Sequence, residues 1–146
     1  MELLEELQPE TPVTASKTRR VVAALIDIFV LFVFGTIIAA LTGQTNPEEG
    51  TIGFSLHGWP AAFFNVGAYL IMVVPEGLTS KTIGKWFLNL KVVKRDGNPN
   101  NLRSSAIRHL LDFVDCFLLI GLFIAARDAN NQRLGDRAAD TIVVDG

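Results

Sequence analysis

The amino-acid sequence predicts an all-α membrane protein that has two transmembrane helices, a third spanning or re-entrant helical segment, and a small cytoplasmic β pairing. Nearly half of the 146 residues (49%) are apolar, and they gather in three blocks, at 21–41, 59–74 and 107–126. A soluble domain instead alternates polar and apolar residues with a helical or strand period. Two segments, at 92–97 and 141–146, begin with β-branched residues and end in Asp-Gly, which is typical of short strands next to tight turns.

The block at 21–41 predicts the first membrane helix. Its 21 residues are enough to cross a hydrocarbon layer of about 30 Å, and they contain one charge, Asp27. An Asp at the centre of a membrane helix is unfavourable by roughly 2.5–3.5 kcal/mol, so Asp27 requires a partner inside the protein. Arg20 precedes it by nearly two helical turns, on the same face and about 10 Å away along the axis. We therefore expect both residues in one polar network, without direct contact.

The block at 59–74 predicts the second membrane helix. It is uncharged but only 16 residues long, so it spans the membrane if its flanks extend it, and it stops at Pro75, Glu76 and Gly77. Asn65 and Tyr69 are four residues apart and share a helix face, which we expect to point toward the other helices. The simpler interpretation of the pair is helix–helix hydrogen bonding without a further role.

The third block, at 107–126, predicts a segment that either spans the membrane or enters and returns. Its uncharged part, 116–126, makes only about 16 Å of helix. If the strands at 92–97 and 141–146 pair, both lie on one side of the membrane, which favours a re-entrant or interfacial segment. A third span would place three arginines outside, against the charge rule: Arg127, Arg133 and Arg137.

Asp112 and Asp115 in this block lie three residues apart on one helix face, with Arg108 one turn before Asp112. The simpler interpretation is a salt-bridged cap at the membrane interface. The sharper one is a polar crevice shared with Asp27, in which burial raises the pKa of one carboxylate so that it carries a proton.

The charge distribution predicts the orientation. Basic residues precede the first block at 17–20 and are frequent at 79–108, whereas the loop at 42–58 contains none. By the positive-inside rule the amino terminus and 79–108 are cytoplasmic. We expect an integral protein of a bacterial cytoplasmic (inner) membrane, with a mobile acidic leader at 1–16 and one membrane domain at 17–146.

The sequence predicts no catalytic site, metal site or cofactor. His57 and His109 are expected on opposite sides of the membrane, the single Cys116 excludes an intrachain disulfide, and no nucleophile elbow is present. We therefore expect no enzyme. The expected partners are membrane lipid and either further copies of the chain or a partner membrane protein, with no nucleic acid.

Three motifs resemble the RDD family of small integral membrane proteins. The segment 20–27, Arg-Val-Val-Ala-Ala-Leu-Ile-Asp, looks like that family's Arg-x-x-Ala-x-x-Ile-Asp in its first helix. Lys-Thr-Ile-Gly-Lys at 81–85, which includes Gly84 and Lys85, and Gln-Arg-Leu-Gly-Asp at 132–136 follow in the family's order. No single motif is specific, but their order and spacing make the match strong over about residues 17–145.

The RDD family is named for one arginine and two aspartates. By motif position these are Arg20, Asp27 and Asp136, with Asp112 or Asp115 as alternatives for the last. The resemblance implies transport of an unidentified ligand, and some members are linked to the exchange of cations and protons.

Two functional hypotheses follow. The first is a transport-associated membrane protein, most concretely a proton-coupled cation exchanger that works through an intramembrane polar network. The candidate members of this network are Arg20, Asp27, Asn65, Tyr69, Asp112 and Asp115. The second is a structural or assembly partner of a membrane complex, in which Asp27 specifies helix pairing and no transport activity resides in the chain.

Overall fold

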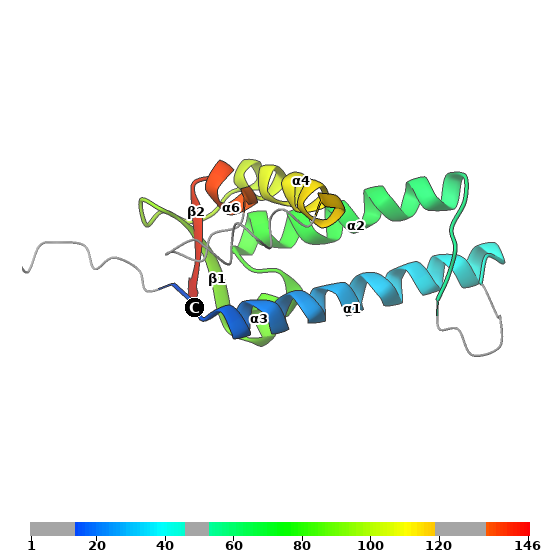
Figure 1. Ribbon diagram of the computed structural model, residues 1–146, viewed down its shortest axis with the longest axis horizontal. Coiled ribbons are helices and arrows are strands. Elements are labelled where there is room, and N and C mark those ends of the chain that lie inside the picture. Colours follow the sequence, from blue (N-terminus) through cyan, green and yellow to red (C-terminus); the bar gives the residue numbers. More distant parts are fainter. Residues whose placement is uncertain (1–13, 46–52, 119–133) are drawn as a thin grey trace, which may run out of the picture.

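The computed structural model describes residues 14–45, 53–118 and 134–146. Two long helices run side by side in opposite directions, and the smaller elements gather where the first begins and the second ends (Figure 1). In chain order the elements are α1 (Lys17–Thr42), α2 (Trp59–Thr79), α3 (Ile83–Phe87), β1 (Leu90–Lys94), α4 (Leu102–Leu118), α6 (Leu134–Ala138) and β2 (Thr141–Asp145).

Helix α1 begins and ends with recognisable caps. The Ser16 hydroxyl accepts a hydrogen bond from the backbone N–H of Arg19 at 3.4 Å, and the helix stops at Gly43 in the left-handed conformation (φ 69°). Its 26 residues extend about 39 Å. Apolar side chains such as Leu25 and Phe29 are exposed along it. An apolar helix with this exposure suits lipid rather than water.

Helix α2 continues beyond the end predicted for it. Pro75 lies inside the helix, which ends only at Thr79, so the prediction that the helix stops at Pro75 was wrong. A proline inside a helix removes one backbone hydrogen bond, and in membrane helices neighbouring helices and Ser or Thr side chains compensate for the loss. The extension places Glu76 inside the helix, where its side chain is fully buried.

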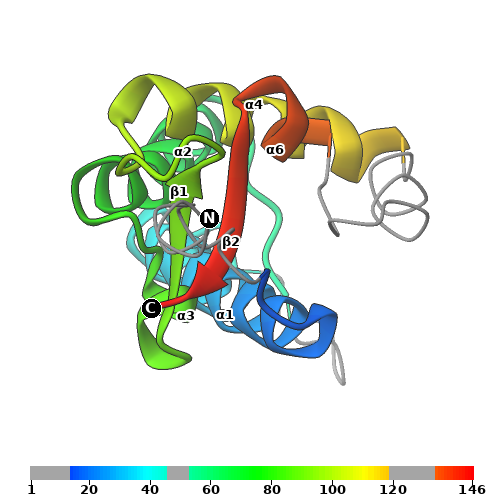
Figure 2. The same ribbon diagram turned by 90° about the vertical axis from the view of Figure 1, so that its left-hand side faces the viewer.

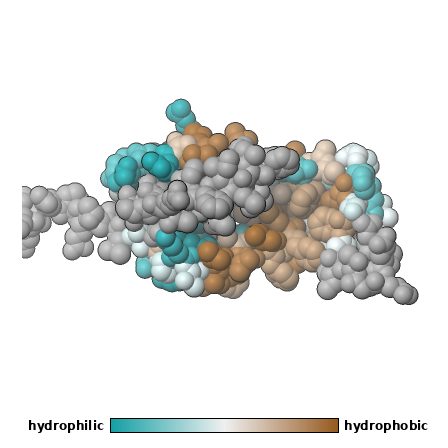
Figure 3. All heavy atoms as spheres, viewed as in Figure 1, coloured by the Kyte–Doolittle hydropathy of each residue, from teal (hydrophilic) through white to brown (hydrophobic). Residues whose placement is uncertain are grey.

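Helices α1 and α2 are both long and apolar enough to cross a membrane. The space-filling view shows an apolar band between hydrophilic surface at the two ends of the molecule (Figure 3). Near the far end the helices contact one another through stacked aromatic rings, with the centroids of Phe34 and Phe64 5.9 Å apart. Gly67 makes room for Phe34, because a Cβ there would lie 2.6 Å from its ring.

Strands β1 and β2 form an antiparallel pair in which Val92 lies opposite Val143. Figure 2 looks onto this end of the molecule and shows the pair between α3 on one side and α4 with α6 on the other. The segments at 92–97 and 141–146 therefore pair with each other. Their apolar residues form a small core with the start of α1, made of Ala15, Ala23, Leu90, Val92 and Val143.

Residues 14–16 belong to this core region. The backbone N–H of Ala15 donates to the carbonyl of Val143 at 2.9 Å, and Thr14 forms an antiparallel β-bridge with Val144. The sequence analysis placed these three residues in the mobile leader, whereas the structure gives them backbone contacts with β2. Residues 1–13 lie outside the described residues, as do 119–126 of the third apolar block.

Candidate functional site

A buried cluster of charged side chains joins the ends of the helices. At its centre is Glu76 of α2, which forms an ion pair with Lys85 of α3. From α4, Nε of Arg108 and Nε2 of His109 lie 3.3 and 3.4 Å from Oε1 of Glu76. The Ser105 hydroxyl donates to the same oxygen at 3.1 Å. Three helices thus converge on one carboxylate that has no contact with solvent.

Asp136 of α6 is the second buried carboxylate of the cluster. It accepts from Nη2 of Arg108 at 2.8 Å and from Nη2 of Arg20 at 2.6 Å. The guanidinium of Arg108 also donates to Oγ1 of Thr141, the first residue of β2, at 3.1 Å. Arg108 therefore links Glu76 to Asp136, and the cluster connects α1, α2, α3, α4, α6 and β2.

Glycines permit the close approach that the cluster requires. A Cβ at Gly77, directly after Glu76, would lie 2.7 Å from the Cα of Leu102 in α4. A Cβ at Gly135, directly before Asp136, would lie 2.8 Å from the carbonyl oxygen of Arg108. Real Cβ atoms do not approach backbone this closely, so each glycine sets the distance between α4 and a neighbouring carboxylate.

Asp27 has a different set of partners, at the start of α3. Its carboxylate accepts from the hydroxyl of Thr82 at 2.6 Å and from the backbone N–H of Gly84 at 2.7 Å. The bond from Gly84 satisfies a backbone donor that a helix leaves unpaired in its first turn. A Cβ at Gly84 would overlap the carbonyl oxygen of Ala23, so α3 lies directly against α1. By fixing α3, Asp27 positions Lys85 for its ion pair with Glu76.

The structure brings together only part of the network expected from the sequence. Arg20 enters the buried cluster through Asp136, whereas Asp27 bonds to α3, so the described contacts put the two residues in different places. Asn65 is exposed and donates to Ala61 of its own helix at 2.8 Å. The Tyr69 hydroxyl donates to the carbonyl of Ala106 at 3.0 Å and thereby joins α2 to α4.

Asp112 lies next to the cluster, with Oδ2 3.2 Å from Nδ1 of His109. The side chain of Asp115 lies outside the described residues. The sequence reasoning treated Glu76 as a helix stop and did not connect His109 with it. The available signals were a carboxylate directly after an apolar span and the spacing of Arg108, His109 and Asp112, which favours side-chain contacts along one helix.

The charges in the cluster are closely balanced. The carboxylates of Glu76, Asp112 and Asp136 are matched by three cationic side chains, Arg20, Lys85 and Arg108, before His109 is counted. Burial lowers the pKa of Lys85 below its ordinary value, and the charge of Glu76 offsets this in part.

His109 has the opposite pKa shift. Burial alone lowers the pKa of this imidazole, but the hydrogen bond with Asp112 and the nearness of Glu76 outweigh it, so the pKa is raised. Protonation then places a positive charge between two carboxylates, with a ring N–H available toward each.

The fold and the cluster together define a class of protein, a membrane helical hairpin that carries buried ion pairs at the end where α1 begins and α2 ends. The chain belongs to the RDD family, whose family model matches residues 14–140. No curated protein and no solved structure matches the chain.

Family membership gives the cluster geometry a wider meaning. Two of the three residues assigned to the family's name by motif position, Arg20 and Asp136, form a buried ion pair. The third, Asp27, holds the segment that contains Lys85. All three therefore act on the same assembly of elements, two of them directly and one through α3.

Proposed function

We propose that this membrane protein takes part in transport as a proton-coupled cation exchanger, with His109 as its proton site between Glu76 and Asp112. The observation that supports this is the position of the His109 ring between two carboxylates. Nε2 lies 3.4 Å from Glu76 and Nδ1 lies 3.2 Å from Asp112. The side chain of Glu76 is fully buried, whereas that of Asp112 is 36% exposed, so the ring connects the interior with the surface.

Imidazole is suited to this task because its charge changes near neutral pH and because one nitrogen accepts a proton while the other releases one. The carboxylates of Asp112 and Glu76 raise the pKa of His109 above its ordinary value, which favours the protonated ring. The proton reaches Nδ1 of His109 from solvent beside Asp112, and the ring holds it as imidazolium between Asp112 and Glu76. Glu76 stays ionised through its ion pairs with Lys85 and Arg108, so the proton returns to solvent when a cation enters the cluster.

The charge balance of the cluster supplies the coupling. A proton on His109 adds one positive charge to a buried group of residues that is otherwise balanced. A second cation in the same low-dielectric region is then repelled, since like charges interact strongly there. Proton and cation therefore exclude one another, which is the requirement for exchange.

The orientation in the membrane follows from the distribution of charge. All the described Lys and Arg residues lie at the end that holds the cluster and both strands, and residues 42–45 and 53–58 at the far end contain neither. This supports a cytoplasmic position for the cluster, in a bacterial inner membrane. Two long helices enclose little interior, so the pathway forms between copies of the chain.

The test uses the purified protein in lipid vesicles with a sodium or potassium gradient and an internal pH-sensitive dye. Wild type is expected to move protons in response to the gradient, and His109→Gln is expected to abolish this flux. His57→Gln is the matched control, because His57 is an exposed histidine at the far end. Flux in His109→Gln equal to wild type, or wild-type flux equal to that of empty vesicles, would refute the proposal.

A second function, assembly of a membrane complex without transport, is favoured by a specific observation. The carboxylates of Asp27, Glu76 and Asp136 all bind groups on other elements and so hold the fold together. Cross-linking in native membranes separates the two functions. A cross-linked partner of different mass supports assembly, and a ladder of identical copies supports a self-contained exchanger.

A further inference from the structure

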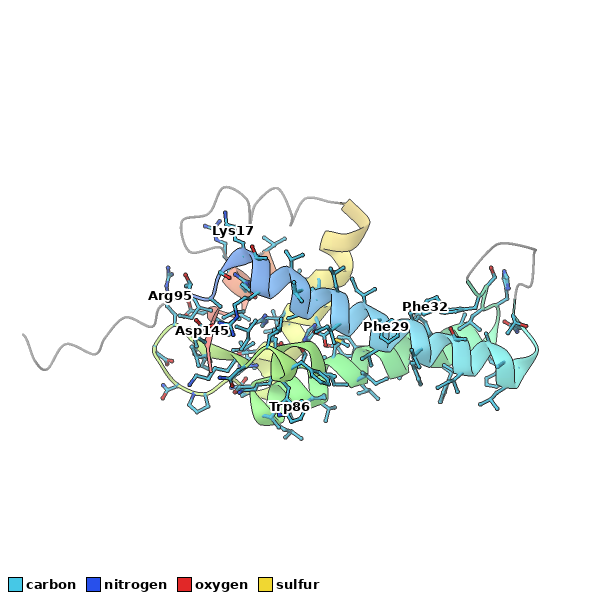
Figure 4. All side chains as sticks on the ribbon, turned by 90° about the horizontal axis from the view of Figure 1, so that it is seen from below. Lys17, Phe29, Phe32, Trp86, Arg95 and Asp145 are labelled. Atoms are coloured by element: carbon cyan, nitrogen blue, oxygen red, sulfur yellow. The ribbon has the colours of Figure 1, made fainter. Side chains whose placement is uncertain are left out.

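The outer face of α3 presents two large apolar side chains away from the protein. Trp86 is 67% exposed and Phe87 is 66% exposed, and their ring centroids lie 5.4 Å apart in an edge-to-face arrangement. Leu78, near the end of α2, is similarly exposed. Figure 4 shows Trp86 at the edge of the molecule, on the side opposite Lys17.

This exposure does not come from loose packing, because the inner side of α3 is held at several points. Asp27 binds its first turn, and Lys85, the neighbour of Trp86, forms an ion pair with Glu76. At the other end of α3 the guanidinium of Arg19 donates to the carbonyl of Leu88. Trp86 and Phe87 are therefore displayed by a fixed scaffold.

The position of α3 matches a membrane boundary. Helix α2 has a tryptophan at its start, Trp59, which is 70% exposed, and α3 follows closely after the end of α2. The 21 residues of α2 extend about 30 Å, the thickness of the hydrocarbon layer. Exposed tryptophans at both boundaries are typical of membrane proteins, since the amphipathic indole prefers the headgroup level.

The charge near α3 matches an anionic surface. Of the 13 Lys and Arg in the chain, 11 lie in residues 14–20, 81–118 and 134–146, all at the end of the molecule that contains α3. Lys81 lies one residue before the N-cap Thr82 of α3, and Arg19 reaches its other end. Basic side chains at this depth attract acidic headgroups.

We propose that α3 is an interfacial anchor that inserts Trp86 and Phe87 at the headgroup–acyl boundary of an anionic leaflet, with Lys81 against the lipid phosphates. The apolar surface of α1 and α2 continues onto α3 at this boundary. This inference is independent of the proposed transport function. Through Lys85, the anchor sets the depth of the buried cluster relative to the lipid.

Tryptophan fluorescence in reconstituted vesicles tests the depth. Trp59→Phe leaves Trp86 as the only reporter, and Trp86→Phe leaves Trp59. A third variant, with both tryptophans replaced and Phe29→Trp added, reports the middle of α1. Lipids brominated near the headgroup are expected to quench Trp86 more than lipids brominated deep in the acyl chain, and the Phe29→Trp reporter should show the reverse order.

Two outcomes would refute the proposal that α3 is an interfacial anchor. Quenching of Trp86 by aqueous iodide but by neither brominated lipid would place α3 in water. Protection from iodide and lipid together, relieved when the protein is diluted, would mean that a second copy covers α3.

The preference for anionic lipid has its own measurement. Brominated phosphatidylglycerol is compared with brominated phosphatidylcholine at the same bromine content in mixed vesicles. A basic side chain near an acidic leaflet enriches anionic lipid by about fivefold, so phosphatidylglycerol should quench Trp86 more, and Lys81→Gln should reduce the difference. Trp59 should show no preference. Equal quenching of Trp86 by both lipids would refute the proposed preference of α3 for anionic lipid.

Discussion

The two ends of the helical hairpin are built by opposite means. At the far end, α1 and α2 meet through rings such as Phe34 and Phe64, with Gly67 making room. At the other end, the carboxylates of Glu76 and Asp136 bind charged side chains from three further helices, α1, α3 and α4. Apolar packing tolerates substitutions of similar volume, whereas a buried ion pair that loses one partner leaves an uncompensated charge. The cluster, rather than the aromatic contacts, therefore determines which arrangement of the small elements is stable.

The largest effect expected from this comparison is that of Glu76→Gln. The substitution removes the charge that balances Lys85 and Arg108, and loss of one partner from a buried pair costs about 3–5 kcal/mol. The free energy of unfolding, measured with denaturant in detergent micelles, should fall by this amount. Ile37→Ala, at an exposed position of α1, is the control and should change it by less than about 0.5 kcal/mol. Similar losses in both variants would mean that the cluster does not dominate stability.

A smaller effect is expected from Gly84→Ala. The added methyl group would overlap the carbonyl oxygen of Ala23 and push α3 away from α1, which also weakens the bonds to Asp27. Overpacking of this kind typically costs about 1–3 kcal/mol. Gly53→Ala is the matched control, because nothing lies within 4 Å of the added atom. Thermal unfolding of both variants tests this, and Gly84→Ala should have the lower melting temperature. Equal melting temperatures would show that α1 and α3 are not closely packed at Gly84.

The smallest effect is the pH dependence that His109 confers. Its pKa is raised in the folded protein, so the stabilisation is complete below about pH 6.5, the ordinary value, and is lost as the pH rises through the raised pKa. Unfolding measured across this pH range should show wild type losing stability, and His109→Gln should lose less. Identical pH profiles for the two proteins would exclude His109 as the titrating group.

Much of this fold could be predicted because its signals are local. The apolar block at 21–41 indicates a helix, and the β-branched segments at 92–97 and 141–146 indicate strands. Neither prediction requires knowledge of the neighbouring segments. The end of α2 was misjudged because Pro75 is usually a helix terminator, yet here it lies within the last turns. A local rule therefore failed where tertiary contacts hold the helix together.

The candidate site was harder to predict because its contacts are distant in sequence. Arg20 and Asp27 were paired on helix geometry alone, but Arg20 binds Asp136 and Asp27 binds α3. Helix periodicity places two residues on one face without saying which segment covers that face. The same limit applied to Glu76, since its partner Arg108 becomes visible only when α4 is placed beside α2.

The ion pair between Arg20 and Asp136 joins residues that are 116 positions apart. During synthesis the ribosome releases Arg20 and the first apolar helix long before it makes Asp136. The side chain of Arg20 therefore remains in water or at the lipid headgroups while both long helices enter the membrane. Closure of the cluster is therefore a late step, which can occur only after α6 has left the ribosome.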